Sequence, residues 1–205
     1  MNLIDRLYEE QIGAIVIGPD GVSTESVPDQ PLVLAGSFNP LHDGHLAMLD
    51  AAQQMVNRQA YFEISIENVD KPRLAKSELQ KRAAQISKTG GSLIVTNAQR
   101  FTEKSSLIPG AIFVIGMDTY IRLMDGRYYP DHVAGDHSAV ENSLDLIDEN
   151  GCSFIVAGRV DDRNQFTILH DIDFEVPMRF KDMFTELTET QFRSDLSSTE
   201  IRNKR

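Results

Sequence analysis

Residues 32–56 read LVLAGSFNPLHDGHLAMLDAAQQMV, and this stretch decides the fold. It begins with a short apolar run, continues through a loop that contains Gly36 and Pro40, and ends in a segment with apolar residues at helical spacing. A buried strand, a loop and a helix with one apolar face together form the repeating unit of a parallel sheet. The helical residues that share the apolar face are Leu46, Leu49, Ala52 and Val56.

Five further apolar runs predict five further strands, so the predicted fold class is α/β with a Rossmann-like, doubly wound parallel sheet. In two of these runs apolar residues alternate with acidic or other polar residues, which gives each strand one less apolar face. We therefore expect 62–66 and 172–176 to lie towards the edges of the sheet. The predicted strands after the first are 62–66, 93–96, 111–115, 154–157 and 172–176.

Two longer segments between these runs predict helices. In 76–87 the apolar residues recur on one face, and two glycines follow as a helix stop. Residues 138–149 predict an acidic helix within an irregular region, 125–151.

The chain of 205 residues fits one large domain with an appendage, because a domain contains roughly 150 residues. Residues 1–30 are the predicted appendage. In this region Pro19-Asp20-Gly21 separates two extended stretches, which is the chemistry of a hairpin turn. Residues 31–205 then form the main domain.

Charge and composition exclude several classes of protein. Twenty basic side chains against 31 acidic ones give a net charge of −11, so we expect neither nucleic acid nor a membrane as a partner. The single cysteine cannot form an intramolecular disulfide, and no apolar run approaches the roughly 20 residues that span a bilayer. We expect a soluble, cytoplasmic protein. A monomer and a homo-oligomer are both compatible with the sequence.

The loop 36–45 contains two histidines, His42 and His45. Ligands of open α/β sheets bind where strands end and helix N-termini present free amides, so this loop is expected to hold phosphates. Gly36 and Gly44 allow the backbone to approach a ligand, and imidazole donates hydrogen bonds to phosphate oxygens. The alternative is that both histidines cap the helix and face solvent. Zinc is disfavoured because no further ligand stands at suitable spacing.

A second polar motif, LSSTEIR, occupies 196–202. Ser197 precedes a glutamate by three residues, which is the spacing of a capping box and predicts the start of a helix. The free amides and the hydroxyls of Ser198 and Thr199 are then available to a phosphate, and Arg202 adds a bidentate cation. The alternative is an ordinary capped C-terminal helix.

These two motifs carry a resemblance to a known family. The stretch 36–45 resembles the H-x-G-H motif of the nucleotidyltransferase superfamily, and its GSFNP opening is most similar to nicotinamide or nicotinate mononucleotide adenylyltransferases. The stretch 196–202 is similar to the C-terminal I-S-S-T-x-I-R segment of that family. The resemblance implies a cytidylyltransferase-like fold, ATP as substrate, a small phosphorylated acceptor, and Mg²⁺ bound mainly through the triphosphate rather than by protein ligands.

The resemblance also implies roles for individual residues. His42 and His45 would contact the α- and β-phosphates, and Arg202 would hold the β- and γ-phosphates together with neighbouring hydroxyls; these three are the implied catalytic residues. The residues implied to bind the nucleotide are Gly36, Ser37, Phe38, Gly44, Gly116, Asp118, Ser197, Ser198 and Thr199.

A basic stretch, 71–82, contains five cations and one acid, a net charge of 5 − 1 = +4 within an acidic chain. A substrate phosphate could dock there. Lys71 and Arg82 resemble the lysine and arginine that family members carry after the second strand and on the next helix. Arg159, after the fifth strand, resembles another basic position of the family. The alternative for the basic stretch is a solvated helix face.

Gly116-Met117-Asp118 follows the fourth strand and resembles the G-x-D motif of the family, whose aspartate contacts the nucleotide ribose. The alternative is that Asp118 only caps the next helix. Family enzymes for nicotinamide mononucleotide commonly place a tryptophan shortly afterwards, against the pyridine ring. This chain contains no tryptophan and offers Tyr120, with Tyr128 and Tyr129 further on.

The resulting hypothesis is a nucleotidyltransferase that moves a nucleoside monophosphate, AMP from ATP, to a phosphate-bearing molecule such as nicotinate or nicotinamide mononucleotide and releases pyrophosphate. The acceptor phosphate is already anionic, so the protein needs to position the reactants and neutralise charge rather than form a covalent intermediate. The alternatives are a cytidylyltransferase, a pantetheine-phosphate type adenylyltransferase, and a nucleotide-binding regulatory module without turnover.

Overall fold

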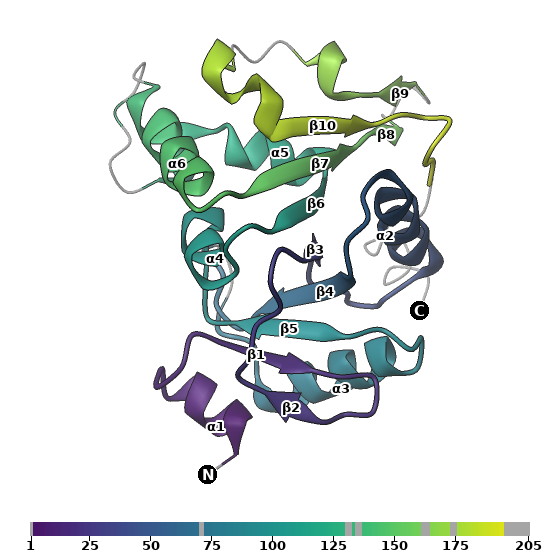
Figure 1. Cartoon of the computed structure of the whole chain (residues 1–205), viewed down its shortest axis with the longest axis vertical. Helices are drawn as coiled ribbons and strands as arrows, with labels where there is room; N and C mark the ends of the chain where they lie inside the picture. The colour runs from purple at the N-terminus through teal and green to yellow at the C-terminus, as the bar shows by residue number, and fades with distance from the viewer. Residues whose placement is uncertain are drawn as a thin grey trace.

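The computed structural model describes residues 2–69, 72–129, 133, 137–160, 165–172 and 176–194. Within these residues, eight strands form one sheet in the order β10-β7-β6-β3-β4-β5-β1-β2 (Figure 1). The parallel strands are β3 (Leu32–Ala35), β4 (Ala60–Ser65), β5 (Leu93–Thr96), β6 (Ile112–Gly116), β7 (Ser153–Ala157) and β10 (Phe184–Leu187). The antiparallel strands are β1 (Ala14–Ile17) and β2 (Ser23–Thr24), and a separate small sheet pairs β8 (Arg159–Val160) with β9 (Phe166–Thr167).

Helices cover both faces of the large sheet. Apolar residues of α1, α2 and α3 pack on one face, and those of α4, α5, α6 and η3 pack on the other. Figure 1 shows α2 on one side of the sheet and α4 and α6 on the other. The α-helices are α1 (Leu3–Tyr8), α2 (Asp43–Met55), α3 (Lys76–Ser87), α4 (Phe101–Leu107), α5 (Met117–Leu123) and α6 (Ser138–Glu149). The 3₁₀ turns are η1 (Gly126–Tyr128), η2 (Leu169–Asp171) and η3 (Met178–Met183).

Strand β3, at the centre of the sheet, is apolar throughout, and both of its faces are covered. In β3, Leu32 and Leu34 face the α2 side, whereas Val33 faces the α6 side. This burial explains why short continuous apolar runs such as those of β3 and β6 predict inner strands of the sheet. The α/β, doubly wound fold predicted from the sequence is confirmed.

The strand order reverses between β3 and β6. The chain moves outward through β3, β4 and β5, then returns to β6 and continues outward on the other side through β7 and β10. Loops at the carboxyl ends of β3 and β6 therefore diverge from each other, which leaves a crevice for ligands at this point in open α/β sheets.

The predicted N-terminal hairpin is present. Val16 pairs with Thr24 in antiparallel register, and Gly21 adopts a φ of +80°, which a side chain would disfavour. The hairpin also extends the large sheet, because β1 pairs with β5 through four residues and Ile15 is fully buried. The first 30 residues thus contribute a strand and core side chains to the same sheet as the rest of the chain.

The predicted edge position of 62–66 is wrong, since β4 lies in the middle of the sheet. The acidic residue of its alternating pattern is buried instead of exposed to solvent. Glu63 is fully buried and accepts hydrogen bonds from Lys104 Nζ at 2.6 Å and Thr96 Oγ1 at 2.7 Å. Lys104 itself is only 8% exposed. A polar residue in an alternating strand thus faces an ion-pair partner rather than solvent.

The predicted strand at 172–176 is also wrong at the two positions that the structure describes, because neither Ile172 nor Val176 lies in a strand, while 173–175 fall outside the described residues. The strand that completes this side of the sheet is β10, whose sequence is FTEL. Only Phe184 and Leu187 of β10 are buried, so the segment has too few apolar residues to predict a strand.

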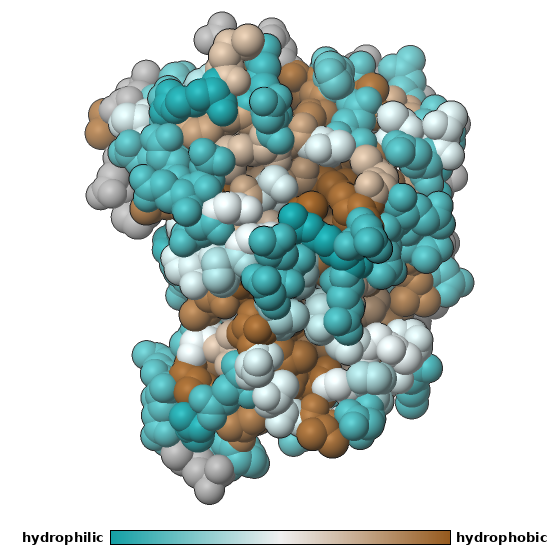
Figure 2. All heavy atoms as spheres, viewed as in Figure 1, coloured by the Kyte–Doolittle hydropathy of each residue, from teal (hydrophilic) through white to brown (hydrophobic). Residues whose placement is uncertain are grey.

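The surface seen in Figure 2 is largely hydrophilic, with apolar residues in separate patches between charged ones. Among the described residues, no helix is both long and apolar enough to cross a membrane.

The buried ion pair yields a stability prediction. Lys104→Met should lower the free energy of unfolding by about 3–5 kcal/mol, because it leaves the Glu63 carboxylate buried without its counter-ion. The matched control combines Glu63→Gln with Lys104→Met, which removes both charges and retains an acceptor for Thr96, and should recover most of the loss. Urea unfolding measures both. A single variant as stable as the wild type would contradict the role assigned to the pair.

Candidate active site

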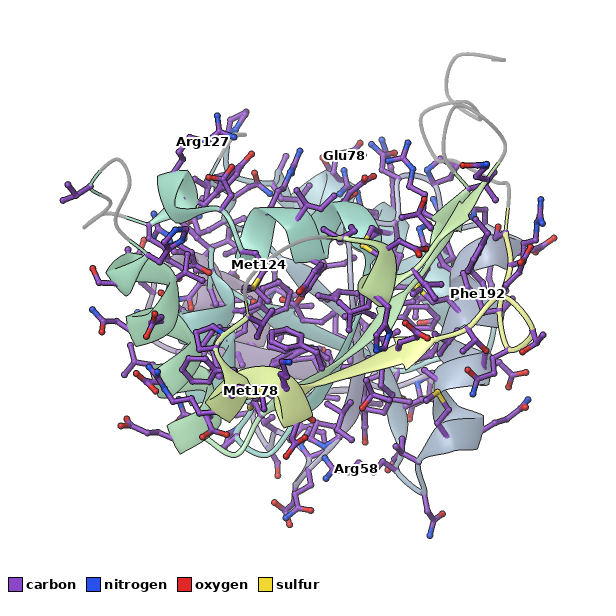
Figure 3. The ribbon with its side chains drawn as sticks, turned by 90° about the horizontal axis from the view of Figure 1, so that it is seen from above. Arg58, Glu78, Met124, Arg127, Met178 and Phe192 are labelled. Atoms are coloured by element: carbon purple, nitrogen blue, oxygen red, sulfur yellow. The ribbon has the colours of Figure 1, made fainter. Side chains whose placement is uncertain are left out.

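A cavity of about 820 Å³ opens at the carboxyl ends of β3, β4, β5 and β6. Its wall includes the loop after β3, the segment from β4 to the start of α3, the beginning of α4, and the end of α5 with η1. In Figure 3, Arg127 and Glu78, which are close in sequence to the lining segments, lie along one edge of the molecule. Arg58, which precedes β4 and so marks the amino-terminal ends of the parallel strands, lies along the opposite edge. The cavity therefore occupies the ligand position expected for a doubly wound sheet.

His42 and His45 are held together at the start of α2. His42 is the N-cap residue in extended conformation, and its backbone N–H donates to Nδ1 of His45 at 3.3 Å. The two imidazole rings stack with centroids 3.7 Å apart. Since Nδ1 of His45 accepts this hydrogen bond, the proton of the neutral ring is on Nε2, which is then a donor.

Both histidines favour the uncharged state. Burial, with a smaller contribution from the nearby His42, lowers the pKa of His45 to about 4. Burial also lowers the pKa of His42. Among the described residues, Nδ1 of His42 is buried without a hydrogen-bond partner. The pair can therefore offer hydrogen bonds to an anion while both imidazoles are uncharged.

The Phe38 ring anchors the loop that precedes these histidines. Phe38 is 1% exposed, and its ring lies edge-on to those of His45 and Phe62, at centroid distances of 5.0 and 5.2 Å. A Cβ on Gly36 would lie 2.9 Å from this ring, so glycine is required there for packing. Phe38 has a φ of +45°, a strained value for a residue with a side chain, which burial of the ring offsets.

Helix α3 supports the same loop from the side. The Arg82 guanidinium donates to the carbonyl oxygen of Ser37 at 2.9 Å, and the Leu41 amide donates to Oε1 of Gln85 at 3.1 Å. Gly36, Ser37 and Arg82 all line the cavity, whereas the two histidine side chains do not. The part of the loop that precedes the histidines therefore contributes to the cavity wall.

The C-terminal segment returns to the start of α2. A Cβ on Gly44 would lie 2.5 Å from Oγ of Ser194 and 3.0 Å from Nδ1 of His42, so a side chain at position 44 would require these groups to shift. Phe192, which is labelled in Figure 3, belongs to the same buried cluster as Leu49 and Ala52 of α2. Ser194 thus brings the chain beside His42. Of the predicted site residues, Lys71, Ser197, Ser198, Thr199 and Arg202 lie outside the described residues.

A family comparison agrees with this arrangement. A model of the family described as cytidylyltransferase-like matches residues 33–204, which include the histidine loop, all cavity-lining segments and the second motif. The chain belongs to this family. The match confirms the superfamily that the two motifs predict, and it begins after α1 and the N-terminal hairpin.

A curated protein of Schizosaccharomyces pombe, named "Putative nicotinamide mononucleotide adenylyltransferase", is 29% identical over 119 residues, which cover 51% of this chain. The chain spans about half the length of that relative, since the match covers 47% of it.

The structure brings two further predicted residues of this cytidylyltransferase-like chain together. Asp118 and Arg159, both exposed, form an ion pair between α5 and β8. Gly116, not Asp118, is the N-cap residue of α5, and no side chain caps this helix, so the alternative role of Asp118 as a cap is wrong.

Tyr120, which the sequence analysis offers as a substrate contact, does not line the cavity. Its side chain is 2% exposed, and its ring packs edge-on against the ring of Phe184.

Several cavity residues have no counterpart in the sequence prediction. Lys104 reaches the cavity from its ion pair with Glu63, and the Arg100 guanidinium donates to the carbonyl oxygen of Tyr128 at 3.1 Å. These residues lie on helices of seven residues or fewer, or next to them, where periodicity gives no signal. The additional lining residues of these segments are Arg100, Phe101, Lys104, Thr119, Arg122 and Leu123. Tyr128 and Tyr129, which the sequence analysis names as candidate aromatic residues, also line the cavity.

A magnesium ion needs oxygen ligands and retains water readily. Among the described residues, no group of three or more His, Cys, Asp or Glu side chains could hold a metal ion. The donors found here, backbone amides and neutral imidazoles, suit phosphate oxygens. A magnesium ion carried mainly by the triphosphate stays a prediction that fits these residues.

The lowered pKa of His45 predicts how stability depends on pH. Between pH 6.5, the ordinary histidine value, and about 4, the unfolded chain binds a proton at position 45 that the folded chain does not. The free energy of unfolding should therefore fall as the pH drops through this range, and His45 should have no effect above it. His45→Asn, which retains an acceptor for the His42 amide, should make the fall shallower in urea unfolding from pH 7 to 4.5. An unchanged slope would contradict the assigned pKa.

Proposed function

We propose that the chain is a nucleotidyltransferase that transfers AMP from ATP to a small phosphorylated acceptor, with nicotinate and nicotinamide mononucleotide as the first candidates. The observation that carries the proposal is the contact region of Gly44, His42 and Ser194, where two distant parts of the chain meet beside a cavity at the strand ends. The printed name of the Schizosaccharomyces pombe relative supports this class of acceptor.

Chain connectivity supports a shared triphosphate site. One residue spans at most about 3.6 Å, so the four steps from Ser194 to Ser198 limit their separation to about 14 Å. This length of chain is compatible with the hydroxyls of Ser198 and Thr199 meeting a ligand held by the histidine loop, and for Arg202, eight steps from Ser194, the limit is about 29 Å. We propose that these side chains bind the β- and γ-phosphates.

In the proposed reaction an oxygen of the acceptor phosphate attacks the α-phosphorus of ATP, and the bond from this phosphorus to the bridging oxygen breaks to release pyrophosphate. His42 and His45 donate hydrogen bonds to oxygens on which negative charge develops, and Arg202 stabilises the leaving group. A bound polyanion raises the pKa of both histidines, and protonation of either ring would make its hydrogen bond to phosphate charge-assisted. When bound, magnesium supplies further charge neutralisation on the triphosphate.

The cavity suits the acceptor. Arginines from three segments line it: Arg73 from the segment before α3, Arg82 from α3 and Arg122 from α5. Tyr128 and Tyr129 add aromatic rings, and the Arg122 guanidinium lies 5.9 Å from the Tyr128 ring centroid. We propose that the cations bind the acceptor phosphate and that this aromatic wall, rather than the buried Tyr120, contacts the base or ring of the acceptor. Asp118, with its partner Arg159, is the proposed contact for the ribose of ATP.

Pyrophosphate release tests the proposal across a matrix of ATP and CTP with nicotinate mononucleotide, nicotinamide mononucleotide, phosphopantetheine and phosphocholine. The expected result is turnover with ATP and one of the two mononucleotides. Turnover with CTP alone would identify a cytidylyltransferase, and turnover with phosphopantetheine would identify that class of acceptor. Nucleotide binding by calorimetry without turnover for any pair would indicate a regulatory module and contradict the proposal.

His45→Ala should reduce kcat by about a hundredfold or more, since it removes a donor directed at the transferred phosphoryl group. The ATP dissociation constant, measured by calorimetry, should change less than tenfold, because much of this interaction is gained only in the transition state. His170→Ala, at an exposed histidine outside the cavity, is the matched control and should retain wild-type kcat. Equal losses in affinity and turnover would assign His45 to ground-state binding instead.

A further inference from the structure

Helix α1 lies before the region that the family model matches, yet it contacts the cavity wall. The Tyr8 hydroxyl donates to the carbonyl oxygen of Leu74 at 2.7 Å, across 66 positions of sequence. Leu74 lines the cavity together with its neighbours Pro72, Arg73 and Ala75. These four residues, which we call the 72–75 wall, form no regular helix or strand. The position of the wall therefore depends on contacts with other elements.

Charged contacts reinforce the attachment of α1 to this wall. Asp5 accepts a hydrogen bond from Lys76 Nζ at 2.6 Å, directly after the wall. Glu10, two residues beyond α1, pairs with Arg73 at 3.4 Å. The cationic groups of Arg73 and Lys76 also lie 5.4 and 5.2 Å from the centroid of the Tyr8 ring. One aromatic ring and two carboxylates thus hold both ends of the wall.

Helix α1 is itself fixed to the rest of the molecule. Leu7 is fully buried in the core beside the sheet, and the Asn2 side chain accepts a hydrogen bond from the Asp5 amide at 2.8 Å at the helix start. Arg6 pairs with Glu25, just after the N-terminal hairpin. On the other side of the wall, the Leu74 amide donates to the carbonyl oxygen of Ile66 at 2.8 Å. The wall is therefore held between β4 and α1.

We propose that α1 sets the position of the 72–75 wall, and that Tyr8 and Asp5 are positioning residues for acceptor binding. This inference rests on the proposed function, in which the cavity holds the acceptor. We expect the effect to fall mainly on the acceptor, because the wall lines the cavity proposed for it, whereas the histidine loop is held by Phe38 and by Arg82 and Gln85, further along α3. Small displacements of groups that position a substrate have large effects on binding and rate.

The test compares steady-state kinetics of the full chain with those of the double variant Asp5→Asn, Tyr8→Phe, which removes the Tyr8 hydrogen bond to Leu74 and the negative charge opposite Lys76 and retains the aromatic ring. The KM for nicotinate mononucleotide should rise about three- to tenfold, in line with the net contribution of such bonds. The KM for ATP and kcat should stay within about twofold. Restoring the carboxylate in Asp5→Glu, Tyr8→Phe should recover part of the acceptor KM.

Arg6→Gln is the matched control, because it removes an ion pair of α1 that does not involve the wall. It should leave both KM values unchanged. Equal acceptor KM values in the double variant and the wild type, or an equal rise in the KM for both substrates, would overturn the inference while the proposed function stands. If calorimetry with nicotinate mononucleotide detects no binding and the wild type shows no turnover, the proposed function fails, and the inference fails with it.

Discussion

The packing of the Phe38 ring against Phe62 and His45 is the interaction on which the candidate site depends. It fixes the loop between β3 and α2 in a conformation that includes a left-handed φ at Phe38 and requires a glycine at 36. Arg82 and Gln85 hold the loop from α3. With the loop fixed, the hydrogen bond from the His42 amide orients His45. The packing of the Phe38 ring therefore determines the direction in which the His45 ring offers its N–H donor.

The sheet supplies the second requirement, which is a rigid frame behind the cavity. Burial on both faces stabilises β3 and β6, whose divergent loops create the crevice. The ion pair of Glu63 with Lys104 spans from β4 to α4 at the base of this region. A buried pair of this kind costs desolvation energy and contributes little net stability compared with apolar residues. Its place beside the cavity suggests that the pair matters for the shape and charge of the site.

The sequence predicts the central part of the fold well because strand burial and helical period are local signals. The loop 36–45 and helices 76–87 and 138–149 follow directly from such patterns. The errors involve partners that are distant in sequence. Glu63 resembles a solvent-facing residue until Lys104, 41 positions later, is brought against it. The contact of Tyr8 with Leu74 has no local signal at all, and β10 has too few apolar residues to stand out.

The central claim is that the histidine loop and the C-terminal motif act on one triphosphate. A crystal structure of the chain with α,β-methylene-ATP tests this most directly. The account predicts that Nε2 of His45 lies within hydrogen-bond distance of an α- or β-phosphate oxygen, while Arg202 contacts the β- or γ-phosphate of the same molecule. A nucleotide bound by one of these groups with the other directed away from the phosphates would contradict the account.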